Sequence, residues 1–144
     1  MAALTVRPAY SSRFSALGGP SHAILRIGAG LLFMAHGAQK LLGAFGGVDG
    51  QGATVELLSQ FGLAGVLELF GGLLLVLGLL TRPVAALLFL EMLVAYAQAH
   101  LPQGALPLQN GGEPAVLFAL VFLFLAGNGP GPWSLDRRFL PRLA

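Results

Sequence analysis

Residues 61–101 read FGLAGVLELFGGLLLVLGLLTRPVAALLFLEMLVAYAQAHL, and this stretch decides the fold. It contains two apolar runs, 61–80 and 83–101, which the short sequence 81–83 separates. A helix that spans a bilayer needs about 20 mostly apolar residues, and each run has about that length. Pro83 suits the first turn of a helix, where its missing N–H removes no hydrogen bond. The stretch therefore predicts two antiparallel transmembrane helices joined by a tight turn.

Two further apolar runs flank this stretch. Residues 23–43 form the first run, which is interrupted by three polar side chains, those of Arg26, His36 and Lys40. Residues 113–128 form the last run, which has Pro114 in its first turn and ends before the sequence GPGP at 129–132. Proline and glycine at these places are typical of helix starts and stops. The loop at 44–60 is rich in glycine, and its last part, 53–60, is a candidate for a short interfacial helix.

The composition also favours lipid as the solvent. Of the 144 residues, 56% are apolar and only 10% are charged, whereas a soluble domain carries about 25% charged residues. Six acidic and eight basic side chains cannot cover a water-facing surface of this size. We expect an all-α integral membrane protein, a bundle of four transmembrane helices within residues 23–132 that cover about 23–43, 61–80, 83–101 and 113–128.

The distribution of arginine predicts the orientation. The tail at 1–22, expected to be flexible, the turn at 81–83 and the tail at 133–144 contain the six arginines Arg7, Arg13, Arg82, Arg137, Arg138 and Arg142. The loops at 44–60 and 102–113 contain no basic residue. Cytoplasmic segments carry the excess of positive charge, so both termini and the central turn are expected in the cytoplasm.

This topology brings ionisable side chains from four helices together in the outer half of the membrane. They are His36, Lys40, Glu68, His100 and Glu113. An ionisable group inside a bilayer costs about 2.5–3.5 kcal/mol and persists when it is paired, near water or functional. The sequence therefore predicts either a site or a set of structural contacts at this level.

Several of these residues have a structural alternative. Glu68 is expected to face a neighbouring helix, because glycines flank it, and to pair with Lys40 or His36. Lys40 could instead extend to the outer surface, and His100 could be an interfacial residue. Glu91 lies near mid-span with Arg26 as its expected partner by depth, and its role is left open.

Other classes of site are excluded or disfavoured. The chain has no cysteine, which excludes disulfides, zinc–thiolate sites and iron–sulfur ligation. The histidines do not have the spacing of a metal site, so no metal is expected. The bases are scattered in ones and twos along the chain, which disfavours nucleic-acid binding.

The motifs of the chain resemble those of the DoxX family. They are RIGAGLLFMAHGAQKL at 26–41, ELFGG at 68–72, GLLTR at 78–82, His100, GGE at 111–113 and GPGPWSLDR at 129–137. The resemblance covers about residues 22–140, and the order and spacing of the motifs make it specific. It implies a bacterial inner-membrane protein of four helices, and some relatives are subunits of quinone-linked oxidoreductases or belong to oxidative-stress systems.

The resemblance also carries over candidate site positions. Arg26, His36, Lys40, Glu68, His100 and Glu113 become candidate ligand-binding residues, and Arg82 is also carried over. From the charge distribution, Arg82, Arg137 and Arg138 are candidates for cytoplasmic contacts and topology. A quinone would take hydrogen bonds from His36 or Lys40, and Glu68 could pass protons, so these three are the catalytic candidates. Glu91 does not belong to the family pattern.

Three functions follow as hypotheses. The first is an accessory or oxidoreductase subunit that binds a quinone, has no covalently bound cofactor and depends on a redox partner protein. The second is a non-catalytic scaffold that recruits a soluble enzyme through its cytoplasmic arginines. The third is a small-molecule carrier, which with four helices would need to form a homo-oligomer.

Overall fold

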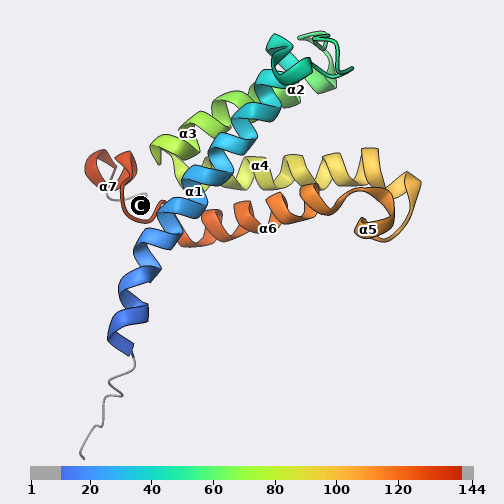
Figure 1. Cartoon of the computed structure of the whole chain (residues 1–144). Helices are drawn as coiled ribbons and strands as arrows, with labels where there is room; N and C mark the ends of the chain where they lie inside the picture. Colours follow the sequence, from blue (N-terminus) through green and yellow to red (C-terminus); the bar gives the residue numbers. More distant parts are fainter. Residues whose placement is uncertain (1–10, 141–144) are drawn as a thin grey trace, which may run out of the picture.

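The computed structural model describes residues 11–140, which form helices and loops and contain no strand. Arg7 and Arg142 lie outside this range. The first long helix is α1, Ser11–Leu42, followed by the short η1, Ala44–Gly46. The second, Gln60–Leu77, consists of α2 (Gln60–Val66), η2 (Leu67–Gly71) and α3 (Gly72–Leu77). The third, Thr81–Gln103, consists of α4 (Thr81–Ala95), η3 (Tyr96–His100) and η4 (Leu101–Gln103). The chain continues through α5 (Pro107–Asn110), the fourth long helix α6 (Glu113–Asn128) and α7 (Leu135–Phe139). The expected all-α class is confirmed (Figure 1).

The helices of the structure begin and end within two residues of the expected spans, except at two ends. Pro83 lies in the first turn of α4, and α6 runs from Glu113 to Asn128 as expected. The second helix stops at Leu77 and does not continue to residue 80, because Gly78 adopts a left-handed conformation with φ 63°. Glycine in this conformation is the common way to end a helix.

The start of α1 differs more. The sequence predicts a flexible tail up to residue 22, whereas the structure is already helical from Ser11 and contains Pro20 within the helix. His22 explains part of the extension, because its Nε2 lies 3.0 Å from the Gly129 carbonyl oxygen and its ring packs on that of Phe124 at 5.0 Å. The early turns of α1 thus rest on the segment that follows α6.

The expected interfacial helix at 53–60 is wrong, because residues 54–59 form a loop and the helix begins only at Gln60. Ser59 is the N-cap, and its hydroxyl accepts the Gly62 N–H at 3.0 Å, which fixes the helix start. Before it, the Asp49 carboxylate accepts the N–H groups of Gln51 (2.8 Å) and Ala53 (3.0 Å). These hydrogen bonds lower the pKa of Asp49, and they favour a turn over a helix.

The four long helices form two antiparallel pairs. Helix α1 packs on the second helix through glycines, and a Cβ added at Gly30 would lie 2.7 Å from the Gly72 carbonyl oxygen. Small residues of this kind let helix backbones approach closely in lipid. Helix α4 packs on α6, and the contact is formed by the buried residues Ala85, Leu88, Met92, Ala115, Ala119, Phe122 and Leu125.

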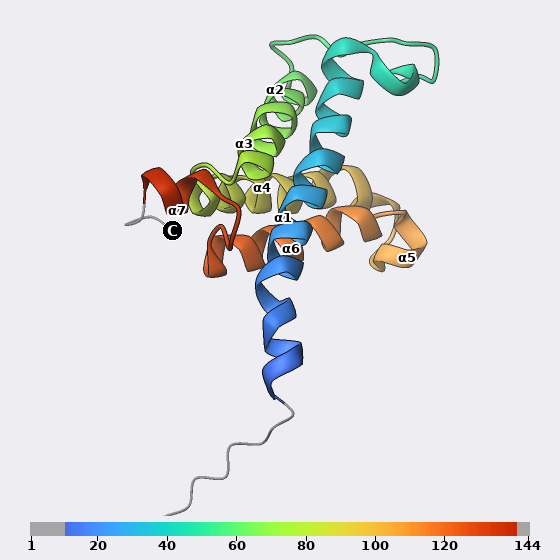
Figure 2. The ribbon, with the colours of Figure 1, turned by 60° about the vertical axis from the view of Figure 1, so that its left-hand side comes forward.

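The two pairs cross each other instead of lying side by side as in the expected bundle. Both views show α4 and α6 running across α1, with α2 and α3 following α1 (Figures 1 and 2). The second helix and α4 meet at the turn at 78–80 and then separate along their length. They stay in contact from the turn as far as Gly71 and Leu88, and the side chains of Gln60 and Gln98 connect them again farther along.

Each long helix keeps an exposed apolar face. Two of them, Gln60–Leu77 and Thr81–Gln103, are long and apolar enough to cross a membrane by length and composition. Large apolar side chains that are about half exposed or more occur on all four, including Leu31, Leu32, Leu63, Phe70, Leu90, Val94, Leu117 and Leu120. A monomeric soluble protein rarely exposes so much continuous apolar surface.

Candidate functional site

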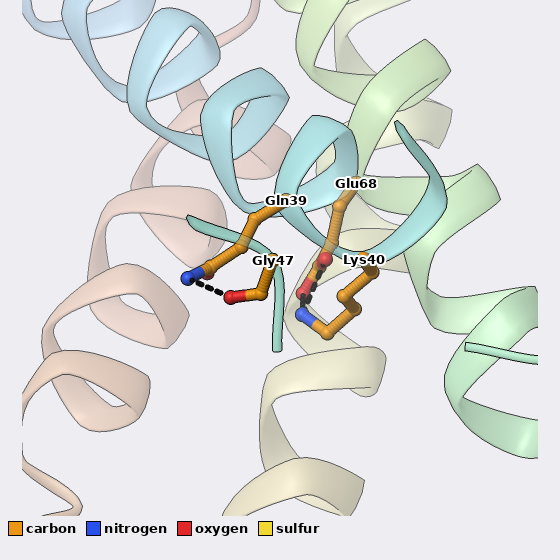
Figure 3. Close-up of polar contacts among 4 residues, drawn as sticks. All are labelled: Gln39, Lys40, Gly47 and Glu68. Atoms are coloured by element: carbon orange, nitrogen blue, oxygen red, sulfur yellow. Dashed lines mark hydrogen bonds and ion pairs between the residues drawn. The ribbon is translucent and has the colours of Figure 1, made fainter. Parts of the chain in front are cut away.

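An ion pair between α1 and η2 forms the polar centre of the candidate site. Lys40 Nζ lies 2.6 Å from Glu68 Oε1 and 2.5 Å from Oε2, so it binds both carboxylate oxygens (Figure 3). Glu68 is 5% exposed. The sequence predicted this pair as the structural alternative for Glu68, and it is confirmed. A charge in apolar surroundings is tolerated when its partner binds it in this way.

Local structure holds both side chains in position. Gly37 and Gly65 let α1 and the second helix approach closely, and a Cβ added at Gly65 would lie 3.1 Å from the Cβ of Lys40. Next to Lys40, the side-chain amide of Gln39 donates to the Gly47 carbonyl at 3.0 Å (Figure 3). The end of α1 is thereby attached to the 44–60 loop, which limits the movement of Lys40.

A largely apolar cleft of about 490 Å³ opens beside this ion pair, between α2–η2 and α4–η3. Its walls include Phe61, Leu63, Leu67, Leu87, Leu90 and Val94. Lys40, Glu68 and Glu91 line it at one end. Toward the other end, the side chain of Gln60 donates a hydrogen bond to that of Gln98, which connects the two walls.

Glu91 is the polar side chain of the cleft that has no partner. Both of its carboxylate oxygens are buried, and neither has a hydrogen-bond partner within residues 11–140. The expected pairing with Arg26 is wrong, because Arg26 lies more than three helical turns before Lys40 in α1 and is used elsewhere. Buried polar groups are nearly always satisfied, so an orphan of this kind calls for an explanation.

Arg26 holds together the opposite end of the molecule. Its guanidinium is fully buried and donates to the carbonyl oxygens of Pro130 (2.8 Å), Trp133 (2.8 Å), Val76 (3.0 Å), Pro132 (3.3 Å) and Leu75. These contacts join α1, the end of α3 and the 130–133 segment. The structure therefore does not bring Arg26 together with Lys40 and Glu68.

Asp136 is a buried charged residue that sequence reasoning did not single out. Its carboxylate accepts the N–H groups of Leu80 (2.7 Å) and Thr81 (2.8 Å), which begin α4. At the end of α6, Arg82 donates to the carbonyls of Ala126 (3.1 Å) and Gly127 (2.5 Å). Both side chains therefore satisfy helix ends. The sequence showed the motif that contains Asp136. It did not show that Asp136 binds the start of α4, because these partners are distant in sequence.

The remaining candidates lie around the cleft but not in it. His36 is exposed, with its ring edge on Phe118 of α6 at 6.1 Å. His100 Nδ1 lies 3.0 Å from the Asn110 carbonyl, and its ring stacks on Tyr96. Glu113 is exposed as the first residue of α6. Of the five residues expected in the outer half, the structure brings only Lys40 and Glu68 into direct contact.

The site has no arrangement that would hold a metal. Across residues 11–140 there is no group of three or more His, Asp or Glu side chains close enough to share an ion. The cleft instead offers apolar walls, an ammonium group already bound by a carboxylate, and one carboxyl group without a partner. Such a site suits an uncharged, lipid-soluble molecule with polar atoms at one end.

The comparisons with known proteins agree with a membrane location. The family model described as DoxX matches residues 21–101. An uncharacterized protein of Haemophilus influenzae is 39% identical over 124 residues, covering 83% of this chain and 91% of the relative. An uncharacterized membrane protein of Mycobacterium tuberculosis is 32% identical, covering 94% of this chain and 91% of the relative. The inner membrane protein YphA of Escherichia coli is 34% identical, covering 80% and 87%. No solved structure matches the chain.

Proposed function

Because the chain belongs to the DoxX family and its relatives are membrane proteins, we propose that it binds a quinone-type molecule within the bilayer. In this proposal it serves as a subunit or accessory of a membrane redox system in a bacterial inner membrane. The observation that carries the proposal is the apolar cleft between α2–η2 and α4–η3, with Lys40, Glu68 and Glu91 at one end.

We further propose that all four long helices span the membrane, with both termini in the cytoplasm. The exposed apolar faces on all four helices support this number of spans. The turn at 78–80, α7 and the segment after α6 meet through Arg26 and Asp136, so the arginine-rich segments lie at one end of the molecule. Crossing pairs require tilted helices, and tilts of up to about 40° occur in membrane proteins.

The dimensions and lining of the cleft support a quinone-type ligand. Small-molecule sites have volumes of about 300–1,000 Å³, with apolar walls and few polar groups, and the cleft has 490 Å³. A quinone ring with its apolar tail would contact the leucine-rich walls. Its oxygens would reach hydrogen-bonding groups at the end with Lys40 and Glu91, because the amides of Gln60 and Gln98 toward the other end already bind each other.

A redox role requires a partner protein. The chain contains no cysteine, and the described residues contain no cluster of metal ligands. Electrons would therefore come from a flavin, haem or iron protein that approaches the membrane. In this proposal the chain binds and presents the quinone, and the partner supplies the electron carrier.

Binding can be tested with a matched pair of cleft variants. The purified protein in lipid nanodiscs should bind a short-chain ubiquinone analogue above the level of empty nanodiscs. Ala99→Trp fills the cleft, which Ala99 lines, and should weaken binding at least about tenfold, equivalent to 1.4 kcal/mol. Ala97→Trp adds the same ring at an exposed position outside the cleft and should leave binding unchanged. Equal binding by both variants would contradict the proposal.

A scaffold function is the second candidate, and α7 favours it. Arg137 and Arg138 are exposed on this short helix, beside the exposed ring of Phe139. Arg82 is not available in the same way, because it caps α6. If a soluble enzyme docks on α7, the double variant Arg137→Glu/Arg138→Glu should lose it in a pull-down from native membranes. Retention of every partner by this variant would count against a scaffold.

A further inference from the structure

The two carboxyl groups of the cleft, those of Glu68 and Glu91, differ in their hydrogen-bond partners. Both oxygens of Glu68 are bound by Lys40, and the Glu68 side chain is only 6% exposed. Glu68 therefore has little capacity left for a ligand, although the sequence made it the candidate proton-transfer residue. Glu91 lines the same cleft, and both of its oxygens are without a partner in the described residues.

We propose that Glu91 is the residue that recognises the ligand, and that it is protonated when a quinone is bound and deprotonated when the hydroquinone is bound, the proton being exchanged with the solvent. The inference rests on the proposed function, that a quinone-type molecule occupies the cleft. As a carboxylic acid, Glu91 donates its O–H to a carbonyl oxygen of the quinone. As a carboxylate, it accepts the O–H of the corresponding hydroquinone. One side chain thereby distinguishes the two forms of the ligand by its own protonation.

Glu91 can reach the ligand by a small movement. Its side chain lines the cleft, while its carboxyl group is buried without a hydrogen bond that would hold it. The terminal torsion of glutamate is broad, so turning the carboxyl group toward the cleft breaks no interaction. The ligand then supplies the hydrogen bond that the buried carboxyl group lacks.

The charged side chains that face Glu91 across the cleft are already bound to each other. Lys40 from α1 and Glu68 from η2 act on it, and these two bind each other. Helix α6, which packs on α4, contains no ionisable side chain beyond its first residue, Glu113. His36 lies on the exposed side of α1 against Phe118 and does not line the cleft. Within the cleft, Glu91 is therefore the ionisable side chain that has no partner in the described residues.

The proposal predicts opposite pH dependences for the two forms of the ligand. Hydroquinone affinity should rise with pH as Glu91 loses its proton, by about tenfold in total, the value of one hydrogen bond, because the carboxylate is the acceptor. Quinone affinity should fall over the same range, because the acid is the donor. The probes are a short-chain ubiquinone analogue and its chemically reduced form, both uncharged in this range. Calorimetry in two buffers of different ionisation enthalpy counts the protons exchanged.

The variant Glu91→Gln separates proton exchange from hydrogen bonding. Its amide can both donate and accept, so both forms should still bind, but with no pH dependence and no proton exchange. Glu91→Leu should weaken both forms about tenfold, as the loss of one hydrogen bond does. Glu56→Gln, in the exposed loop outside the cleft, is the matched control and should behave as the wild type.

The outcomes distinguish the two proposals. If neither form binds above empty nanodiscs, the proposed function fails. If both forms bind but their pH dependences have the same sign, or persist in Glu91→Gln, the inference about Glu91 is overturned while the proposed function stands. Should Glu91→Gln not fold, infrared difference spectra of the wild type decide. Hydroquinone should decrease the carboxylic acid band, and an unchanged band overturns the inference.

Discussion

Arg26 and Glu68 are buried and Glu91 is partly buried, and the surroundings of their polar groups differ. Arg26 is surrounded by backbone carbonyl oxygens, Glu68 is bound by Lys40, and Glu91 has no partner in the described residues. The cost of burying a charge is offset fully in the first two environments and not in the third. Substitution at each position should therefore have a different effect on stability.

The Lys40–Glu68 pair should show strong coupling in a double-mutant cycle. Lys40→Met leaves Glu68 buried without its partner and should lower the free energy of unfolding by about 3–5 kcal/mol, as removal of one member of a buried pair does. The double variant Lys40→Met/Glu68→Leu removes both charges and should recover most of that loss. Unfolding in mixed detergent micelles measures all four proteins. Additive effects would show that the two side chains do not interact.

Arg26 should be essential for stability and not for ligand binding. Arg26→Met leaves several backbone carbonyls at the ends of α3 and α6 without a donor, so we expect a loss above about 3 kcal/mol. Arg137→Met, at an exposed position, should change stability by less than about 0.5 kcal/mol. Comparable small losses for both arginines in the same unfolding assay would contradict this role.

The sequence was informative for individual residues where the pattern was local. Glycines around Glu68 correctly indicated that it faces a neighbouring helix, and the pair with Lys40 was among the alternatives. Prediction from the sequence failed for residues whose partner is distant in sequence. The residues near Arg26 in sequence do not indicate that it binds carbonyl groups more than 100 residues away. Its depth along the helix wrongly suggested Glu91 as its partner. Helix depth fixes one coordinate only, whereas contact depends on how helices rotate and cross.

At the scale of the elements, glycines decide which helix faces pack. Gly37 of α1 faces the second helix, where an added Cβ would lie 2.7 Å from the Gly65 carbonyl oxygen and 2.7 Å from Leu69 Cα. Gly28, on the same helix, has no atom within 4 Å of such a Cβ. The two positions therefore form a matched pair for the same substitution.

Gly37→Ala should lower the free energy of unfolding by about 1–3 kcal/mol, because backbone atoms cannot move aside as a flexible side chain can. Gly28→Ala should be neutral or stabilising by up to about 1 kcal/mol, because alanine favours the helix. The same unfolding titration compares them. A loss at position 28 equal to that at position 37 would show that helix propensity, and not close packing, controls both sites.

The long helices were predictable from apolar length and from proline and glycine at their ends, but their irregularities were not. The π-helical turns at Leu67–Gly71 and Tyr96–His100 both contribute to the walls of the cleft. Turns of this kind frequently occur at functional sites. They arise from packing between helices, which an apolar run does not encode. For the same reason the crossing of the helix pairs, and hence the cleft, was absent from the expected bundle.

At the scale of the whole molecule, the topology determines how deep the cleft lies in the bilayer and toward which side it opens. If the four helices span the bilayer with cytoplasmic termini, Lys40 and Glu68 lie in its outer half, and the end of the cleft at Gln60 and Gln98 lies near the outer surface. Gln98 is seven residues beyond Glu91, which corresponds to about 10 Å along a helix. A ligand that enters from the lipid would then meet Glu91 at the depth of the membrane interior.

The absence of cysteine makes this topology directly testable, because every introduced thiol is the only one in the chain. Gln51→Cys lies in the loop after α1, Gln109→Cys lies between the third helix and α6, and Phe139→Cys lies on α7; all three positions are exposed. A membrane-impermeant maleimide should label positions 51 and 109 in intact spheroplasts. Position 139 should be labelled only after the membrane is opened, because positive charge keeps its segment in the cytoplasm.

The three positions together separate the alternatives that any one of them leaves open. Labelling of 51 without 109 means that one of the two helices between them, the second or the third, does not cross, so the two walls of the cleft do not both span the bilayer. Labelling of all three in intact spheroplasts means that positions 109 and 139 lie on the same side, so α6 does not make the expected single crossing. Labelling of 139 alone reverses the whole chain, which preserves the cleft but opens it toward the cytoplasm. Only the first outcome removes the binding site, because it alone separates Glu91 from Lys40 and Glu68.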